Sequence, residues 1–174
     1  MTAESPTFDL LRSATRSAVH FESRDIYLPD DPDWRDWREG RRFHPAERWR
    51  SWFDLMKETT GRGVTVRRAR VVSEPISEYI GFEYDVTADH NIAAGEQVRW
   101  LSRRDAFDLL VPAVDYWVFD ESTVVLNNFD GVGNWVGEER HDDAALAVYL
   151  GSAFDAVWNR ATAHEDYRPA RVTG

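Results

Sequence analysis

The stretch from Val64 to Val72 has the β-branched content of a strand, yet it carries three arginines where a strand should be most apolar. Successive side chains of a strand point to opposite faces of the sheet. Two of the arginines then share a face with three valines, so we expect their guanidinium groups to be only partly solvated. The first face carries Val64, Val66, Arg68, Arg70 and Val72, and the second carries Thr65, Arg67, Ala69 and Val71.

Apolar residues at helical spacing predict helices on both sides of this strand. Ser5 followed by proline opens the first helix, and Pro45 opens the second. Ser73 can cap a third helix, and Asp142 or Asp143 a last one. The apolar stripes are Phe8, Leu11, Ala14 and Ala18; Trp49, Trp52, Phe53 and Met56; Ile76, Tyr79 and Ile80; and Leu146, Tyr149, Leu150, Ala153, Phe154, Val157 and Trp158.

Further strands are predicted after residue 96. Gln97 to Leu101 forms one, and the segments DYWVFD and STVVLNNFD form a hairpin that turns at Asp120 to Ser122. The glycine-rich run GVGNWVGEE is expected to add a third antiparallel strand. Earlier in the chain, Phe21 to Leu28 alternates only weakly and is not assigned to a strand.

These elements indicate an α/β fold, with α+β as the alternative. We expect one mixed central sheet of about five to six strands flanked by helices, because a helix feeds a strand through a very short loop. A length of 174 residues fits a single domain, 1–174. Within it we expect an N-terminal helical extension over about 5–44, a core over about 45–165 and a frayed tail over 168–174.

Composition excludes several classes of protein. The chain has no cysteine, which rules out disulfides and thiolate chemistry, and no apolar run approaches the ~20 residues of a membrane helix. The N-terminus lacks the pattern of a signal peptide, so we expect a cytoplasmic protein with no membrane association. The five histidines lie far apart, with no pair at metal-ligand spacing. We therefore expect neither a metal nor a cofactor.

A net charge of −10 argues against direct nucleic-acid binding, which depends on an excess of positive charge. The charge is uneven, however: residues 34–70 hold eleven basic and five acidic side chains, a local charge of +6 that leaves −16 on the rest. Such polarity fits a complementary surface on a partner or on a second copy in a homodimer. The alternative is that the two halves neutralise each other within the fold.

The arginines of the central strand are the main candidate site. A partly buried guanidinium needs a paired acceptor, and the next element offers Glu74, Glu78, Glu83 and Asp85. An intramolecular ion-pair network is one interpretation, and a site for an anionic ligand or an acidic partner segment is the other. The candidate ligand- or partner-binding residues are Arg67, Arg68, Arg70, Glu74, Tyr79, Glu83 and Arg99.

Several blocks of the chain resemble an uncharacterised actinobacterial family of unknown function. The blocks are RVVSEPISEY, NIAAGEQVRWLSR, DYWVFD and VYLGSAFDAVWNRATAHEDY, and the resemblance runs from about Phe8 to Tyr167. Members of that family are often encoded beside helix-turn-helix regulators of the XRE type. The resemblance implies a regulatory or accessory role with such a regulator as partner, and it brings no catalytic residues.

The order of elements is also similar to half of a phospholipase-D-like domain. The signature of that superfamily is H-x-K-x4-D, and alignment on DYWVFD matches Asp120 to its aspartate. Asp115 then stands at the lysine position and Ala113 at the histidine position. Both the nucleophile and the phosphate-binding lysine are missing, so the resemblance implies a phosphoesterase scaffold without its catalytic motif.

We therefore expect a non-enzymatic regulatory or accessory protein that binds a partner or a small anionic effector and is linked to transcriptional regulation. The alternative is a degenerate or novel phosphoester-processing enzyme. That enzyme would act through the cluster of Arg67, Arg68, Arg70 and Arg99.

Overall fold

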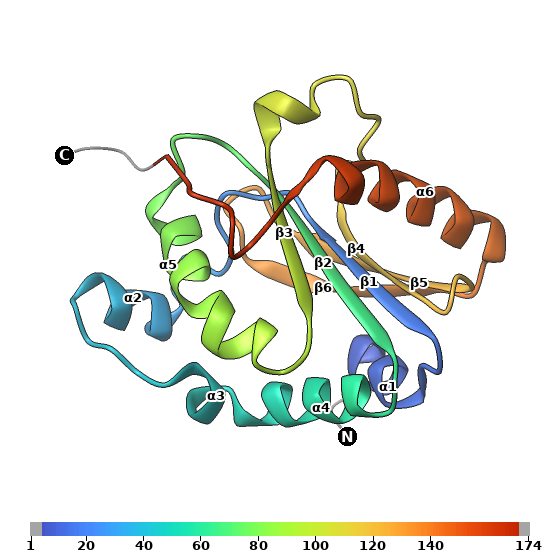
Figure 1. Cartoon of the computed structure of the whole chain (residues 1–174), viewed down its shortest axis with the longest axis horizontal. Coiled ribbons are helices and arrows are strands. Elements are labelled where there is room, and N and C mark those ends of the chain that lie inside the picture. The colour runs from blue at the N-terminus through green and yellow to red at the C-terminus, as the bar shows by residue number, and fades with distance from the viewer. Residues whose placement is uncertain (1–4, 171–174) are drawn as a thin grey trace.

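The computed structural model describes residues 5–170 and contains one mixed sheet with helices on both faces (Figure 1). The α-helices are α1 (Pro6–Ser13), α2 (Pro32–Arg38), α3 (Pro45–Arg48), α4 (Arg50–Gly61), α5 (Glu78–Thr87) and α6 (Ala144–Arg160). The strands are β1 (Ser17–Glu22), β2 (Thr65–Val72), β3 (Gln97–Ser102), β4 (Asp115–Phe119), β5 (Thr123–Phe129), β6 (Trp135–His141) and β7 (Thr162–Ala163). A π-helical turn, η1 (Ala88–Ile92), continues α5, and a 3-10 turn, η2 (Arg103–Ala106), follows β3.

The strand order across the sheet is β6-β5-β4-β1-β2-β3-β7. Strands β1, β2 and β3 run parallel, and β4 pairs antiparallel with β1. The hairpin of β4 and β5 continues antiparallel into β6, as the sequence predicted. The α/β class with one mixed sheet is confirmed, with seven strands in place of five or six.

Strand β1 corrects the expectation of a helical extension over residues 5–44. Helix α1 ends at Ser13, and Ala18, which the helical spacing assigned to it, lies in β1. This strand is central, between β4 and β2, and every residue from Ala18 to Glu22 is buried. A strand buried on both faces need not show the alternation that makes a half-buried strand visible in a sequence.

The two faces of the sheet have different covers. Helix α6 packs on one face, where Phe154 and Val157 are fully buried against Phe21 and Val71. Helices α1, α4 and α5 cover the other face (Figure 1). Burial of a side chain such as Phe154 contributes roughly 1.5–3 kcal/mol, so α6 alone anchors its face firmly.

The start of α5 differs from the expectation that Ser73 caps it. Ser73 instead donates from its backbone N–H and its Oγ to Asp25, over 2.8 and 2.6 Å. Ser77 is the cap, and its Oγ accepts from the Ile80 N–H over 3.1 Å. The helix therefore begins at Glu78, beyond the segment that carries Glu74.

The chain ends outside the described range are residues 1–4 and 171–174, which include most of the tail expected over 168–174. No helix in residues 5–170 is long and apolar enough to cross a membrane.

Candidate functional site

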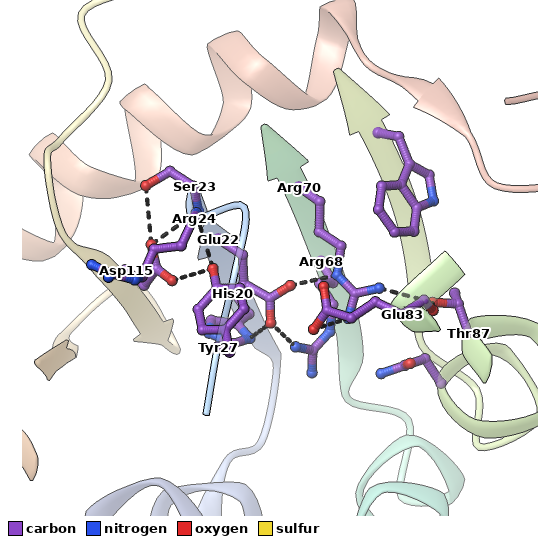
Figure 2. A network of polar contacts seen from close by, with 12 residues as sticks. His20, Glu22, Ser23, Arg24, Tyr27, Arg68, Arg70, Glu83, Thr87 and Asp115 are labelled. Atoms are coloured by element: carbon purple, nitrogen blue, oxygen red, sulfur yellow. Dashed lines mark hydrogen bonds and ion pairs between the residues drawn. The ribbon is translucent and has the colours of Figure 1, made fainter. Parts of the chain in front are cut away.

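A row of polar side chains crosses the middle of the sheet on the face beneath α4 and α5 (Figure 2). His20 pairs in register with Arg68, and Glu22 pairs with Arg70, across the parallel strands β1 and β2. On the other side of β1, Asp115 begins β4. Because alternate residues of a strand share a face, these side chains all point away from α6.

Glu22 lies at the centre of this row and joins the two arginines. Arg70 Nε donates to Glu22 Oε2 over 2.5 Å, and Arg68 Nη1 donates to Glu22 Oε1. Burial alone would raise the pKa of Glu22, but the guanidinium groups of Arg70 and Arg68 hold it well below its ordinary value. On its other side, Arg68 Nε donates to Glu96 Oε2 over 2.8 Å. This geometry favours the ion-pair interpretation for both arginines.

Arg70 also reaches α5. Its Nη1 donates to Thr87 Oγ1 over 2.8 Å, and its Nη2 lies 3.8 Å from Glu83 Oε1. Glu83 is thus one partner that the sequence predicted correctly. Burial raises the pKa of Glu83 to about 7, although the charge of Arg70 acts in the opposite direction. Glu83 therefore titrates near neutral pH, unlike Glu22.

A cavity of about 250 Å3 lies between this row and the helices, and we call it the sheet-face cavity. Three buried side-chain atoms in its wall have no hydrogen-bond partner among the described residues: His20 Nδ1, Glu83 Oε2 and His90 Nδ1. His20 Nδ1 lies 3.4 Å from Glu22 Oε1 but lacks the alignment of a hydrogen bond. The cavity is lined by His20, Glu22, Asp31, Trp49, Trp52, Arg68, Arg70, Tyr79, Phe82, Glu83, Val86, His90 and Asn91.

Both histidines of the cavity are neutral at physiological pH. Burial and the charge of Arg68 hold the pKa of His20 well below its usual range. Burial lowers the pKa of His90 to about 4. Leaving a buried polar atom without a partner costs about 1–3 kcal/mol, and several such atoms in one cavity mark a place where a ligand or water can supply the missing bonds.

Four of the seven predicted site residues line the sheet-face cavity: Arg68, Arg70, Tyr79 and Glu83. The other three lie elsewhere. Arg67 and Arg99 are on the opposite face under α6, where Arg67 Nη1 donates to Asp155 over 3.0 Å and Arg99 Nη1 donates to the Trp158 carbonyl over 3.0 Å. Glu74 is exposed and accepts from the Tyr167 hydroxyl.

The cluster of four arginines proposed for a phosphorylated substrate is therefore not formed. Arg67 and Arg68 are neighbours in one strand, so their side chains project to opposite faces of the sheet. Arg99 pairs in register with Ala69, which places it on the face of Arg67. The other two suggested partners lie beside α2, where Glu78 pairs with Arg38 at 3.2 Å and Asp85 accepts from the Trp37 indole N–H over 3.2 Å.

The three positions aligned with the phospholipase D signature have separate environments. Ala113 is exposed in the loop before β4. Asp115 is buried and accepts from the Ser23 N–H over 2.9 Å and from the Tyr27 hydroxyl over 2.5 Å; burial raises the pKa of Asp115 to about 6. Asp120 lies at the far end of β4 and accepts from the backbone N–H of Ser17 over 2.9 Å.

Sequence reasoning missed the residues that complete the network: His20, Glu22, Glu96 and His90. The available signal was the alternation of His20 and Glu22 with the apolar residues Val19 and Phe21. Within residues 5–170, no group of three or more histidines and carboxylates is arranged to hold a metal ion.

Comparison with known proteins identifies a similar fold and a family. The structure is similar to Nuc, a phospholipase D family member from Salmonella typhimurium, with a TM-score of 0.53 and 15% sequence identity over 92% of this chain and 88% of that chain. At this identity the likeness concerns the fold alone. No curated protein matches the chain. A family described as a domain of unknown function, DUF6879, matches residues 7–169, and the chain therefore belongs to the DUF6879 family.

Proposed function

We propose that this protein is a non-enzymatic binding module whose effector site is the sheet-face cavity. The observation that carries the proposal is the convergence of three unpartnered buried atoms, His20 Nδ1, Glu83 Oε2 and His90 Nδ1, on one cavity from β1, α5 and η1. A polar ligand that satisfies them gains binding free energy that an apolar ligand cannot.

A second cavity, of about 280 Å3, lies beside α6 and is lined in part by Arg67 and Asp155. In the described part of the chain, no buried side-chain atom that lacks a partner belongs to its lining residues. Arg67 is already paired with Asp155. The second cavity is slightly larger, but its polar side-chain atoms do not need a ligand. The unpartnered buried atoms therefore favour the sheet-face cavity as the binding site.

Binding is favoured over phosphoester chemistry. The positions of the signature histidine and lysine hold Ala113 and Asp115, and neither side chain can replace a nucleophilic imidazole or a phosphate-binding ammonium. The arginines nearest to the cavity are already paired with carboxylates, so a phosphate would have to compete with Glu22, Glu96 and Glu83 for their guanidinium groups. An enzyme that processes phosphoesters remains the alternative that the experiment below also tests.

The biological role that we propose is regulatory, with a helix-turn-helix regulator of the XRE type in an actinobacterium as partner. The support is the resemblance of the sequence blocks to an actinobacterial family encoded beside such regulators, together with the local charge of +6 over residues 34–70. A basic surface of this kind can steer association with an acidic partner. Affinity purification from the native host tests this part, and recovery of the protein alone would count against it.

The effector site is tested with thermal-shift measurements on a panel of small cationic, anionic and neutral compounds. Val86→Phe narrows the cavity, and Val136→Phe serves as control because Val136 is 66% exposed on β6. We expect at least one compound to stabilise the wild type and the control but not Val86→Phe. Compounds that act equally on all three proteins would contradict the proposal. Turnover of bis(4-nitrophenyl) phosphate by the wild type would instead support the enzyme.

A further inference from the structure

The aromatic rings of the sheet-face cavity differ from most others in the fold. Five of the eight tryptophans have an arginine guanidinium within 6 Å of the ring centre, as in the pair of Arg99 and Trp158 at 4.5 Å. Among the described residues, no lysine or arginine stacks on the four rings that line the cavity. Those rings are Trp49, Trp52, Tyr79 and Phe82. The stacked tryptophans are Trp34, Trp37, Trp100, Trp117 and Trp158.

The charge of the cavity wall is also unbalanced. Each side-chain nitrogen of Arg68 donates to Glu22 or Glu96, so the charge of this arginine is already compensated by two carboxylates. Arg70 keeps one nitrogen without a hydrogen bond, Nη2, which lies 3.8 Å from Glu83. When Arg68 is counted with Glu96 and Arg70 with Glu22, the carboxyls of Glu83 and Asp31 remain as surplus negative charge in the cavity wall.

Two of the unpartnered atoms can accept hydrogen bonds: Glu83 Oε2 when Glu83 is ionised, and His90 Nδ1 in the neutral tautomer that carries its proton on Nε2. Glu83 Oε2 has no donor, and its side chain is only 14% exposed. His90 is 7% exposed, and its Nδ1 also lacks a partner. Trp49 packs against the His90 ring at 5.0 Å, so an aromatic face and an acceptor lie beside each other.

We infer that the sheet-face cavity binds an organic cation that carries N–H donors, a primary ammonium or a guanidinium group. The inference rests on the proposed function, because it names the class of ligand for the same cavity. The aromatic rings of the cavity, on which no lysine or arginine of the described residues stacks, attract a cation, and Glu83 Oε2 and His90 Nδ1 accept its hydrogen bonds. A quaternary ammonium lacks the donors, and an anion must compete with Glu22 for the guanidinium groups.

Isothermal titration calorimetry at pH 7.5 tests the ligand class with n-butylguanidinium, n-butylammonium, tetramethylammonium and butyrate as probes. We expect the first two to bind, tetramethylammonium to bind at least several-fold more weakly, and butyrate not to bind. Glu83→Gln keeps the shape and removes the charge, and should weaken binding of n-butylguanidinium about tenfold or more. His90→Phe keeps an aromatic ring at this position but removes the Nδ1 acceptor, so it should also weaken binding of n-butylguanidinium.

Glu78→Gln is the matched control, because Glu78 lies on the same helix, outside the cavity, with a side chain that is 68% exposed. Equal binding by wild type and Glu83→Gln would overturn the inference. A different result would separate the two proposals: butyrate or a neutral compound binds to the wild type but not to Val86→Phe, and the cations do not bind. That result would overturn the ligand class and still support the cavity as the effector site. If no compound of any class binds in a manner that depends on Val86, both the inference and the proposed function fail.

Discussion

Glu22 and Arg70 face each other across the parallel strands β1 and β2, and Arg70 Nε donates to Glu22 Oε2 over 2.5 Å in a setting where both side chains are at most 10% exposed. The other oxygen of Glu22 accepts from Arg68. One carboxylate thus bonds to two buried guanidinium groups in the middle of the sheet, and removing it leaves Arg70 Nε and Arg68 Nη1 without their acceptors.

We expect Glu22→Ala to lower the free energy of unfolding by about 3–5 kcal/mol, because breaking a buried ion pair from one side leaves its partner charged and unpaired. Urea denaturation followed by circular dichroism measures the change. Glu58→Ala is the control, since Glu58 pairs with Arg62 at the surface of α4 with a side chain that is 69% exposed. The control should cost no more than about 1 kcal/mol. Equal losses for the two variants would contradict the central role of Glu22.

Glu83→Gln is expected to stabilise the protein at alkaline pH. The pKa of Glu83 is about 7 in the folded state, well above that of an unfolded glutamate. Between about pH 4.5 and 7 the folded state alone binds this proton, so the stability of the wild type falls as pH rises through that window. The variant stays neutral and avoids the loss. We expect it to exceed the wild type by roughly 1–3 kcal/mol at pH 8 and to match it near pH 5.

Several charged and titratable groups surround Glu83 and form its electrostatic environment: Glu22 and His20 from β1, Arg68 and Arg70 from β2, Asp115 from β4, Tyr27 and Asp31 from the segment between β1 and α2, Tyr79 from α5 and His90 from η1. The exposed Glu58→Gln controls for the general effect of lost charge. A stability difference between Glu83→Gln and wild type that does not change from pH 5 to pH 8 would contradict the assignment to Glu83.

Asp120 is the one residue that matches the phospholipase D signature, and its contacts assign it a structural task. Its carboxylate accepts from the backbone N–H groups of Thr15, Arg16 and Ser17 over 2.9, 2.8 and 2.9 Å. We expect Asp120→Asn to lower stability by about 1–3 kcal/mol, because an amide has one acceptor oxygen in place of two. Asparagine also tolerates the positive φ of 49° at this position.

The effect of Asp120→Asn should depend on pH. Burial acts to raise the pKa of Asp120, but hydrogen bonds from the Ser17, Thr15 and Arg16 N–H groups outweigh it and lower the pKa. The stabilisation is present above the unfolded pKa of about 3.9 and is lost as pH falls through the lower folded value. Thermal unfolding at pH 7 and pH 3 should show a smaller difference at pH 3. Glu121→Gln, in the same turn, is the control.

The sequence was informative where a turn bounds a strand or where a helix has both an apolar stripe and a cap. The strand at residues 65–72, the β4–β5 hairpin and α6 were predicted because their apolar periodicity and caps are local features. The two-faced distribution of Arg67 and Arg68 also followed from period two. Strand β1 was missed because its inward face carries His20 and Glu22, whereas the equally buried β4 was identified by the hairpin turn that follows it.

The candidate site was only half predictable for the same reason. Arg68 and Arg70 were recognised as unusual within their strand, and Glu83 follows in the next helix. Glu22 and Glu96 lie 46 and 28 residues from Arg68 in the sequence, so their pairing depends on which strands become neighbours. A pattern that is local in sequence can identify a buried charge that needs a partner, but it cannot identify a partner supplied by the topology.

Tyr27→Phe tests the second buried carboxyl of the polar row. The Tyr27 hydroxyl donates to Asp115 Oδ2 over 2.5 Å, and both residues are buried. Loss of the hydroxyl leaves Asp115 Oδ2 without this donor. We expect the free energy of unfolding to fall by about 1–3 kcal/mol at pH 8, where Asp115 is ionised. The pKa of Asp115 is about 6, so at pH 5 this carboxyl is mostly protonated and the missing donor should cost less. Urea denaturation at pH 5 and pH 8, with Tyr149→Phe as control because Tyr149 is 62% exposed, measures this difference. An equal or larger cost at pH 5 would show that the hydroxyl stabilises the fold by packing rather than through the ionised form of Asp115.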